Sequence, residues 1–134
     1  MRKIVMAIVI TFLLFTCGCG GGGDSSSVPT TSDSSLNVIP ALLSPKNGSY
    51  VNSYTPHFIW TPVPNATYYR LNYSGSNDWG EKLYSAAAIN IGNTCEVFDI
   101  SLAQGGVLWK VKAFVNGSWQ PYSSSGYFEI HIMY

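Results

Sequence analysis

The chain has 134 residues, with seven basic and seven acidic side chains, a low charged fraction and many aromatic residues. This length supports one folded domain, and the lack of a basic cluster beyond the first three residues argues against a nucleic-acid partner. Few charges together with many tyrosine, tryptophan, valine and isoleucine residues favour a β-rich domain.

The N-terminal segment combines a positively charged start with a short apolar run. Arg2 and Lys3 precede residues 4–15, an apolar stretch that is broken only by Thr11. A helix of that length reaches about 18 Å, which is shorter than the roughly 30 Å of a hydrocarbon core. The pattern therefore predicts a secretory signal segment rather than a membrane-spanning helix.

Two cysteines, Cys17 and Cys19, follow the apolar run among small residues. A cysteine in this position resembles the signal peptide of bacterial lipoproteins. The resemblance implies that one cysteine becomes the lipidated first residue of the mature chain. Cys19 is favoured because Gly18 precedes it, and Cys17, which has Leu14 three residues before it, is the alternative. A plain signal peptide with incidental cysteines is a further alternative.

The lipoprotein resemblance implies a signal peptide over residues 1–18 and a stable membrane anchor, since several acyl chains hold a protein far better than one. A glycine, not an aspartate, follows either cysteine. In that family this implies the outer membrane of the cell envelope. Residues 19–37 then form a linker rich in Gly, Ser and Thr, which is expected to be a flexible coil spanning roughly 20–25 Å.

The composition changes at Val38, where alternating apolar residues begin. A first strand is expected at 39–45, and its prolines confine it to a sheet edge. Further strands are expected at 55–61, 66–74 and 94–100, each with the period-two pattern of a half-buried strand. The residues expected on the buried faces are Phe58, Trp60, Tyr69, Leu71, Tyr73, Cys95, Val97, Trp109, Val111, Ala113, Phe128, Ile130 and Ile132. The alternation of residues 94–100 also extends to Asp99 on the face of Cys95 and Val97.

Two stretches give weaker signals. Residues 76–81 read as a polar loop that holds Trp79. Residues 82–91 fit either a helical turn, because of three successive alanines, or an edge strand. Both alternatives stay open on the sequence.

The clearest local prediction is a hairpin near the C-terminus. Residues 107–115 alternate, with Lys110 and Lys112 on the face opposite the apolar residues. Asn116-Gly117 then predicts a type I′ turn, which needs positive φ at both central residues. A second extended run leads from this turn to Ile132.

About seven short strands separated by turns are typical of an antiparallel two-sheet β-sandwich. The motifs resemble the fibronectin type III-like modules of bacterial extracellular proteins over residues 38–134. That resemblance implies a central core position for Trp60, no conserved disulfide, and a tyrosine corner at the position that Val107 occupies here. The motifs are Pro45-x-Asn47-Gly48, Phe58-x-Trp60, Ala66-x-x-Tyr69-x-Leu71, Trp109-x-Val111-x-Ala113, Tyr122-Ser123 and Phe128-x-Ile130.

The sequence offers little catalytic chemistry. It has two histidines, His57 and His131, and nothing in their spacing brings them together. No metal-binding motif or cofactor fingerprint is present, so no cofactor is expected. Cys95 fits a buried small apolar residue better than a reactive thiol. The chain is therefore predicted not to be an enzyme.

Aromatic residues outside the expected core are the candidate ligand contacts, namely Trp79, Trp119 and Tyr122. Exposed rings can stack on sugars or anchor a protein partner. Alternatively, Trp79 and Trp119 cap the ends of the sandwich. The sequence thus predicts a lipid-anchored binding or scaffolding module with an unknown protein or glycan partner, and a carbohydrate- or peptidoglycan-binding module is the alternative.

Overall fold

The computed structural model describes residues 38–134. The predicted signal segment 1–18, the candidate lipidation sites Cys17 and Cys19, and the predicted linker 19–37 lie outside the described residues. Within the described part of the chain, no helix is long and apolar enough to cross a membrane.

The described residues form strands joined by turns, with one helical turn, so the all-β prediction is confirmed. The helical turn is α1 (Ala86–Ile89). The strands are β1 (Leu42–Ser44), β2 (Ser49–Val51), β3 (Phe58–Trp60), β4 (Ala66–Gly75), β5 (Trp79–Ser85), β6 (Asn90–Ile91), β7 (Thr94–Val97), β8 (Gly105–Val115), β9 (Ser118–Trp119) and β10 (Gly126–Ile130).

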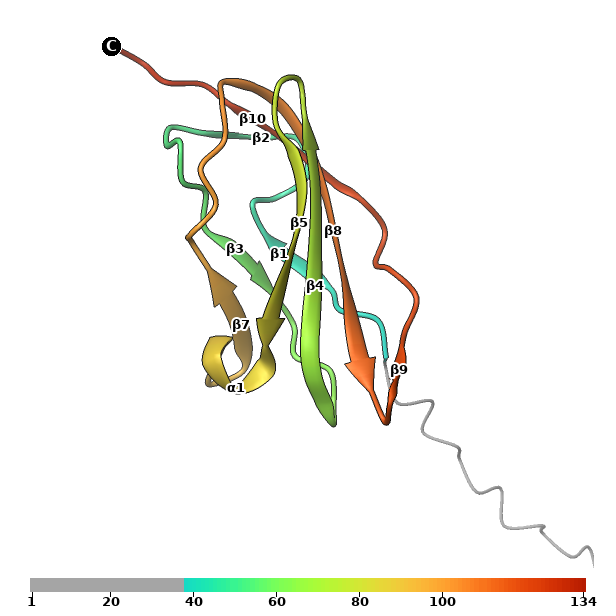
Figure 1. Cartoon of the computed structure of the whole chain (residues 1–134). Helices are drawn as coiled ribbons and strands as arrows, with labels where there is room; N and C mark the ends of the chain where they lie inside the picture. The colour runs from blue at the N-terminus through green and yellow to red at the C-terminus, as the bar shows by residue number, and fades with distance from the viewer. Residues whose placement is uncertain (1–37) are drawn as a thin grey trace, which may run out of the picture. The chain divides into compact units, whose positions relative to one another are not determined.

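The strands form two sheets, which lie on either side of one core (Figure 1). The four-stranded sheet has the order β1-β3-β7-β6. The six-stranded sheet has the order β2-β10-β8-β4-β5, and β9 pairs with β8. Two sheets that share a core give a sandwich-like architecture. As expected from its prolines, β1 lies at a sheet edge.

The strand arrangement differs from the sequence prediction in two respects. The described residues contain ten strands rather than about seven, because β2 and β6 are short additions and the last arm is divided into β9 and β10. In addition, β2 pairs parallel to β10, whereas the other pairs are antiparallel. The chain crosses between sheets after β1, where Gly48 N–H donates to the Tyr127 carbonyl at 2.7 Å.

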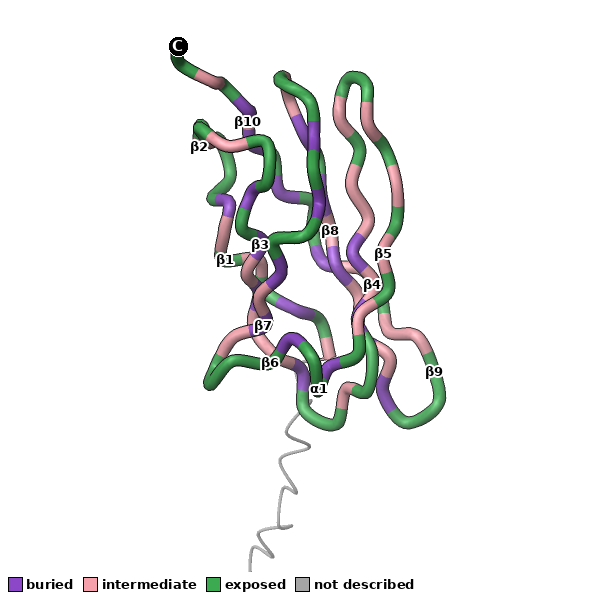
Figure 2. Tube along the Cα trace, turned by 60° about the vertical axis from the view of Figure 1, so that its left-hand side comes forward, coloured by how far each residue is buried: buried purple, intermediate pink, exposed green. Residues whose placement is uncertain are grey.

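The predicted hairpin is present between β8 and β9. Asn116 and Gly117 have φ values of 49° and 82°, so both central turn residues adopt the positive φ that a type I′ turn requires. Figure 2 shows how burial changes along the chain, and in β8 buried residues alternate with more exposed ones. The turn residues and the alternation together set the register of the hairpin.

The second arm of the hairpin is interrupted at residues 120–125. The β8–β9 register pairs Phe114 with Trp119, whereas the β8–β10 register pairs Trp109 with Gly126, so the second arm carries extra residues. Ser123 spans the interruption, because its N–H donates to the Val111 carbonyl and its hydroxyl accepts from the Val111 N–H. Pro121 has no N–H to continue the ladder.

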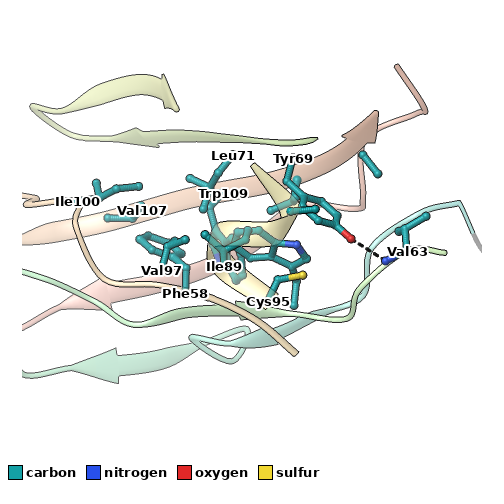
Figure 3. Packing of buried hydrophobic residues seen from close by; sticks show 14 of the residues in the cluster. Phe58, Val63, Tyr69, Leu71, Ile89, Cys95, Val97, Ile100, Val107 and Trp109 are labelled. Carbon is teal, nitrogen blue, oxygen red and sulfur yellow. Dashed lines mark hydrogen bonds between the residues drawn. The ribbon is translucent and has the colours of Figure 1, made fainter. Parts of the chain in front are cut away.

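Side chains from both sheets meet in one buried cluster (Figure 3). The Trp109 and Phe58 ring centroids are 4.9 Å apart, and those of Trp60 and Tyr69 are 5.7 Å apart, both in edge-on geometry. The residues predicted on the buried faces are buried, except that Tyr73 and Ile132 pack partly exposed against the cluster. Asp99 is exposed, because β7 ends at Val97 and the alternation does not continue to Asp99. The predicted core is confirmed in its composition.

In residues 76–91, the predicted loop around Trp79 is wrong, and the structure contains both the helical turn and the edge strand. Trp79 is the first residue of β5 rather than part of a loop, and the loop is limited to residues 76–78. Both alternatives for residues 82–91 are realised in turn, since β5 continues to Ser85 and the alanine run forms α1. β5 lies at one edge of its sheet, and β2 lies at the other.

The inward side of β5 carries polar groups that contact Asp99. Lys82 Nζ lies 3.1 Å from Asp99 Oδ2, and Tyr84 Oη donates to Asp99 Oδ1 at 2.6 Å. Partial burial opposes ionisation of Asp99, but these hydrogen bonds hold its pKa below the ordinary value. A charge on an edge strand also discourages pairing with another chain.

Candidate functional site

The solvent-facing side of the six-stranded sheet gathers most of the polar and aromatic side chains that the core does not use. Strand register places them in rows across β5, β4 and β8, because directly paired residues share a face. We call this surface the outer face. It consists of Trp79, Glu81, Leu83, Tyr68, Arg70, Asn72, Ser74, Leu108, Lys110, Lys112, Phe114, Trp119 and Tyr122.

All three predicted ligand contacts lie on the outer face. Trp79 pairs with Ser74, which pairs with Leu108, whereas Trp119 pairs with Phe114 farther along β8. The Trp79 and Trp119 rows are therefore about 20 Å apart along the strands, at about 3.4 Å per residue. These two tryptophans occupy different ends of one face, with Tyr122 between their rows.

Trp119 packs against two cations and one ring. The Arg70 guanidinium carbon lies 4.5 Å from the centroid of the Trp119 ring, and Lys112 Nζ lies 5.2 Å from it. The Phe114 and Trp119 ring centroids are 5.1 Å apart. These contacts hold the indole against the sheet and use its π system within the domain.

Tyr122 continues the same arrangement. Lys110 Nζ and Lys112 Nζ each lie 4.5 Å from the centroid of its ring. Its hydroxyl donates to Glu81 Oε2 at 3.2 Å, and Glu81 Oε1 also lies 3.3 Å from Arg70 Nη1. Partial burial and the Glu81 carboxylate raise the pKa of Tyr122. Cations and rings thus alternate along β8 in what we call the cation–aromatic ladder, formed by Arg70, Trp119, Lys112, Tyr122 and Lys110.

Trp79 differs from the two ladder aromatics. Its side chain is 83% exposed. Among residues 38–134, it makes no ring contact, cation contact or side-chain hydrogen bond. It therefore does not cap the sandwich, and both faces of its indole are open to solvent.

A shallow hollow lies beside the Trp79 row. It has a volume of about 160 Å³ and is lined by Asn72, Ser74, Leu108, Trp109, Lys110 and Ser125. A second hollow of about 450 Å³ adjoins it, because both are lined by Ser74 and Leu108. The residues around the first hollow therefore include a lysine, an asparagine and two serines.

The outer face is positively charged over the ladder. In the described part of the chain the ion pairs are His57–Glu96, Arg70–Glu81 and Lys82–Asp99. Lys110 and Lys112 consequently have no carboxylate partner within residues 38–134. Two unpaired cations on one face favour an anionic ligand over a cationic one.

The two histidines have separate partners. His57 Nε2 lies 2.9 Å from Glu96 Oε2, and its ring packs edge-on against Phe98. The His131 ring packs against Tyr50. In residues 38–134 no three His, Cys, Asp or Glu side chains form a group that could hold a metal ion.

Cys95 is the free cysteine of the described residues, and it is fully buried. Its thiol donates to Asn90 Oδ1 at 2.9 Å. Burial raises the pKa of the Cys95 thiol to about 11 from 9.0. The interpretation of Cys95 as a buried small residue is confirmed.

We expect Cys95 to resist thiol reagents in the folded protein. Two pKa units lower the thiolate fraction about 100-fold near pH 8, and burial adds steric protection. Ellman's reagent should therefore modify this residue within minutes in urea but only slowly in native buffer, with Cys95→Ser measured in parallel to subtract other thiols. Fast labelling in native buffer would contradict this placement.

No protein family model matches the chain, and no curated protein matches it.

The sequence predicts the aromatic residues of the outer face, and the alternation of residues 107–115 predicts that Lys110 and Lys112 face solvent. It does not predict that these lysines lie against the rings of Trp119 and Tyr122. Their neighbours Arg70 and Glu81 come from other strands, and only the cross-strand register brings them together. A single sequence does not specify that register.

Proposed function

We propose that this chain is a lipid-anchored, non-enzymatic protein of the bacterial cell envelope that acts as a binding or scaffolding module. The outer face is the observation that carries the binding role. It presents an exposed Trp79, an ordered ladder and two cations without carboxylate partners on one sheet. Exposed aromatic and cationic groups fixed on a rigid sheet are typical of recognition surfaces.

We also infer that the sandwich is fibronectin type III-like. The chain alternates between the sheets as Greek-key sandwiches do, with β1, β3 and β7 in one sheet and β4, β8 and β10 in the other. Trp60 is completely buried, as that resemblance implies. Val107 occupies the place of the usual corner tyrosine, and a different residue, Tyr69, makes a hydrogen bond to a loop.

The carbohydrate-binding alternative has one specific observation in its favour. Trp79, Trp119 and Tyr122 share the outer face, and Trp79 has both ring faces free. Sugar rings stack on such indoles through their C–H groups, while polar neighbours bind the hydroxyls. The ladder rings are less suited to stacking, since their π systems already contact cations.

Intact mass spectrometry of the protein recovered from the membrane fraction tests the anchor. We expect the mass of a chain that begins at Cys19 and carries several acyl groups, because the lipid attaches to that cysteine. Cys19→Ser should abolish acylation, and Cys17→Ser, which leaves with the signal peptide, should not change the mature mass.

A mass that corresponds to an acylated chain starting at Cys17 would make Cys17 the lipidated residue. The proposed lipid anchor would still hold. A soluble, unacylated product cut elsewhere would overturn the lipid anchor and the outer-membrane location, and would leave a secreted module. Fractionation of inner and outer membranes then tests the location.

A further inference from the structure

We propose that the outer face binds an acidic polysaccharide, with one sugar ring stacked on Trp79 and a carboxylate of the chain held by Lys110. This inference rests on the proposed binding role and names the class of ligand. It is carried by the juxtaposition of a free indole, the polar hollow and two cations without carboxylate partners.

Trp79 supplies the stacking surface. It is the first residue of the edge strand β5, so an extended ligand reaches it from the open side of the sheet. The indole contributes a large rigid area at low entropic cost, and its solvent exposure of 83% leaves that area available. Its register partner Ser74 lines the adjacent hollow.

The hollow supplies the polar contacts. Within residues 38–134, the side chains of Asn72, Ser74 and Ser125 make no hydrogen bonds with the protein. An amide and two hydroxyls can both donate and accept, which matches the ring hydroxyls of a sugar. Lys110 also lines this hollow, and its ammonium lies 4.5 Å from the centroid of the Tyr122 ring. An ammonium donates to a carboxylate in a strong charge-assisted hydrogen bond.

The ladder holds the cations in place. Lys110 Nζ and Lys112 Nζ each lie 4.5 Å from the centroid of the Tyr122 ring, and the Tyr122 hydroxyl donates to Glu81 Oε2. Fixing a long lysine side chain in advance lowers the entropy lost when a ligand binds. The Glu81 carboxylate pairs with Arg70 and accepts a hydrogen bond from Tyr122. Because Glu81 does not pair with Lys110 or Lys112, both lysines can bind an external anion.

The shape of the site favours a polymer over a compact ligand. Two shallow hollows adjoin along the strand direction, and the Trp79 and Trp119 rows lie about 20 Å apart along the strands. A flat, extended polar surface suits several consecutive sugar units better than one enclosed molecule. Successive carboxylates along such a chain then contact Lys110 and Lys112.

Isothermal titration of the full protein, extracted from membranes in a nonionic detergent, tests the inference. The probe is an oligogalacturonate, and the comparison is a neutral maltooligosaccharide of matched length. We expect the oligogalacturonate to bind at least about tenfold more tightly, with an affinity that falls as salt rises. Trp79→Ala and Lys110→Gln should each weaken binding about tenfold.

Two matched controls separate the site from general effects. Lys46→Gln removes the same charge from the loop between β1 and β2, outside the outer face. Phe98→Ala removes an exposed ring that follows β7. Both variants should bind the oligogalacturonate like the parent, and circular dichroism should show all four variants folded.

Three results would overturn the inference. Equal binding of the neutral oligosaccharide would remove the requirement for an acidic ligand, and equal binding of single-stranded DNA would mean a general polyanion site. No binding of oligogalacturonate by the folded protein would exclude the acidic polysaccharide. These binding results do not test the lipid anchor. The mass of the mature protein tests the anchor separately.

Discussion

Replacing Trp60 or Trp109 with alanine should lower the free energy of unfolding by about 3–5 kcal/mol. Both indoles are essentially inaccessible to solvent, and they are the two largest fully buried side chains. Each contacts a further aromatic ring, Tyr69 for Trp60 and Phe58 for Trp109. Truncation would remove this packing and leave a cavity that the two sheets cannot close, because each sheet is held by its own hydrogen-bond ladder.

A domain of this size is stable by about 5–10 kcal/mol, so either variant should be marginal or unfolded at 37 °C. Urea unfolding followed by circular dichroism measures the effect. Trp79→Ala is the matched control, and its exposed indole should change stability by less than about 0.5 kcal/mol. Parent-like unfolding of both core variants would show that the core is centred elsewhere.

The core could be predicted because burial on a sheet has a strict period of two. Phe58 and Trp60, or Trp109 and Val111, are separated by one residue, and an apolar residue at every second position marks the inward face. The hairpin turn could also be predicted from the sequence, since few residues other than asparagine and glycine adopt positive φ without strain. Both signals are local in the chain.

The strand β5 could not be predicted in the same way. Its inward positions are Gly80, Lys82 and Tyr84, so it has no apolar alternation. An edge strand needs only one paired neighbour, and here β4 supplies that pairing. The polar residues around Trp79 therefore predict a loop, whereas the structure places Trp79 in β5, beside Ser74 on the outer face.

The ladder illustrates the same limit for the candidate site. Trp119 and Tyr122 were expected from the sequence as exposed rings, but the structure gives them cationic neighbours from β4 and β8. Their π systems stabilise the outer face and orient the lysines. We infer that these two aromatics act mainly by positioning, whereas Trp79 is free to contact a ligand directly.

The second large effect concerns Tyr69, whose hydroxyl accepts a hydrogen bond from the Val63 N–H at 2.7 Å (Figure 3). Tyr69 is fully buried, and Val63 is also buried in the turn between β3 and β4. Tyr69→Phe would leave this buried N–H without a partner, which should lower the free energy of unfolding by about 1–3 kcal/mol. Urea unfolding near pH 7.5 measures the loss.

Tyr73→Phe is the matched control for the hydroxyl group. Tyr73 lies on the same side of β4, and within residues 38–134 its hydroxyl makes no hydrogen bond. Its removal should change stability by less than about 0.5 kcal/mol. Equal effects of the two substitutions would show that the contact between Tyr69 and the turn contributes nothing specific.

The pH dependence of Tyr69→Phe gives an independent test of the same burial. Burial raises the pKa of Tyr69 to about 12 from 10.0, so the folded state holds this proton more tightly than the unfolded state does. The stabilisation that the buried Tyr69 hydroxyl gives the folded state is complete below pH 10. It declines as the pH rises from 10 towards 12, because in this range the tyrosine ionises in the unfolded state but not in the folded state. The parent should therefore lose stability more steeply than Tyr69→Phe between pH 10 and 11, and the difference between the two proteins should narrow. A constant difference over that range would mean that folding does not raise the pKa of the Tyr69 hydroxyl, and therefore that this hydroxyl reaches solvent.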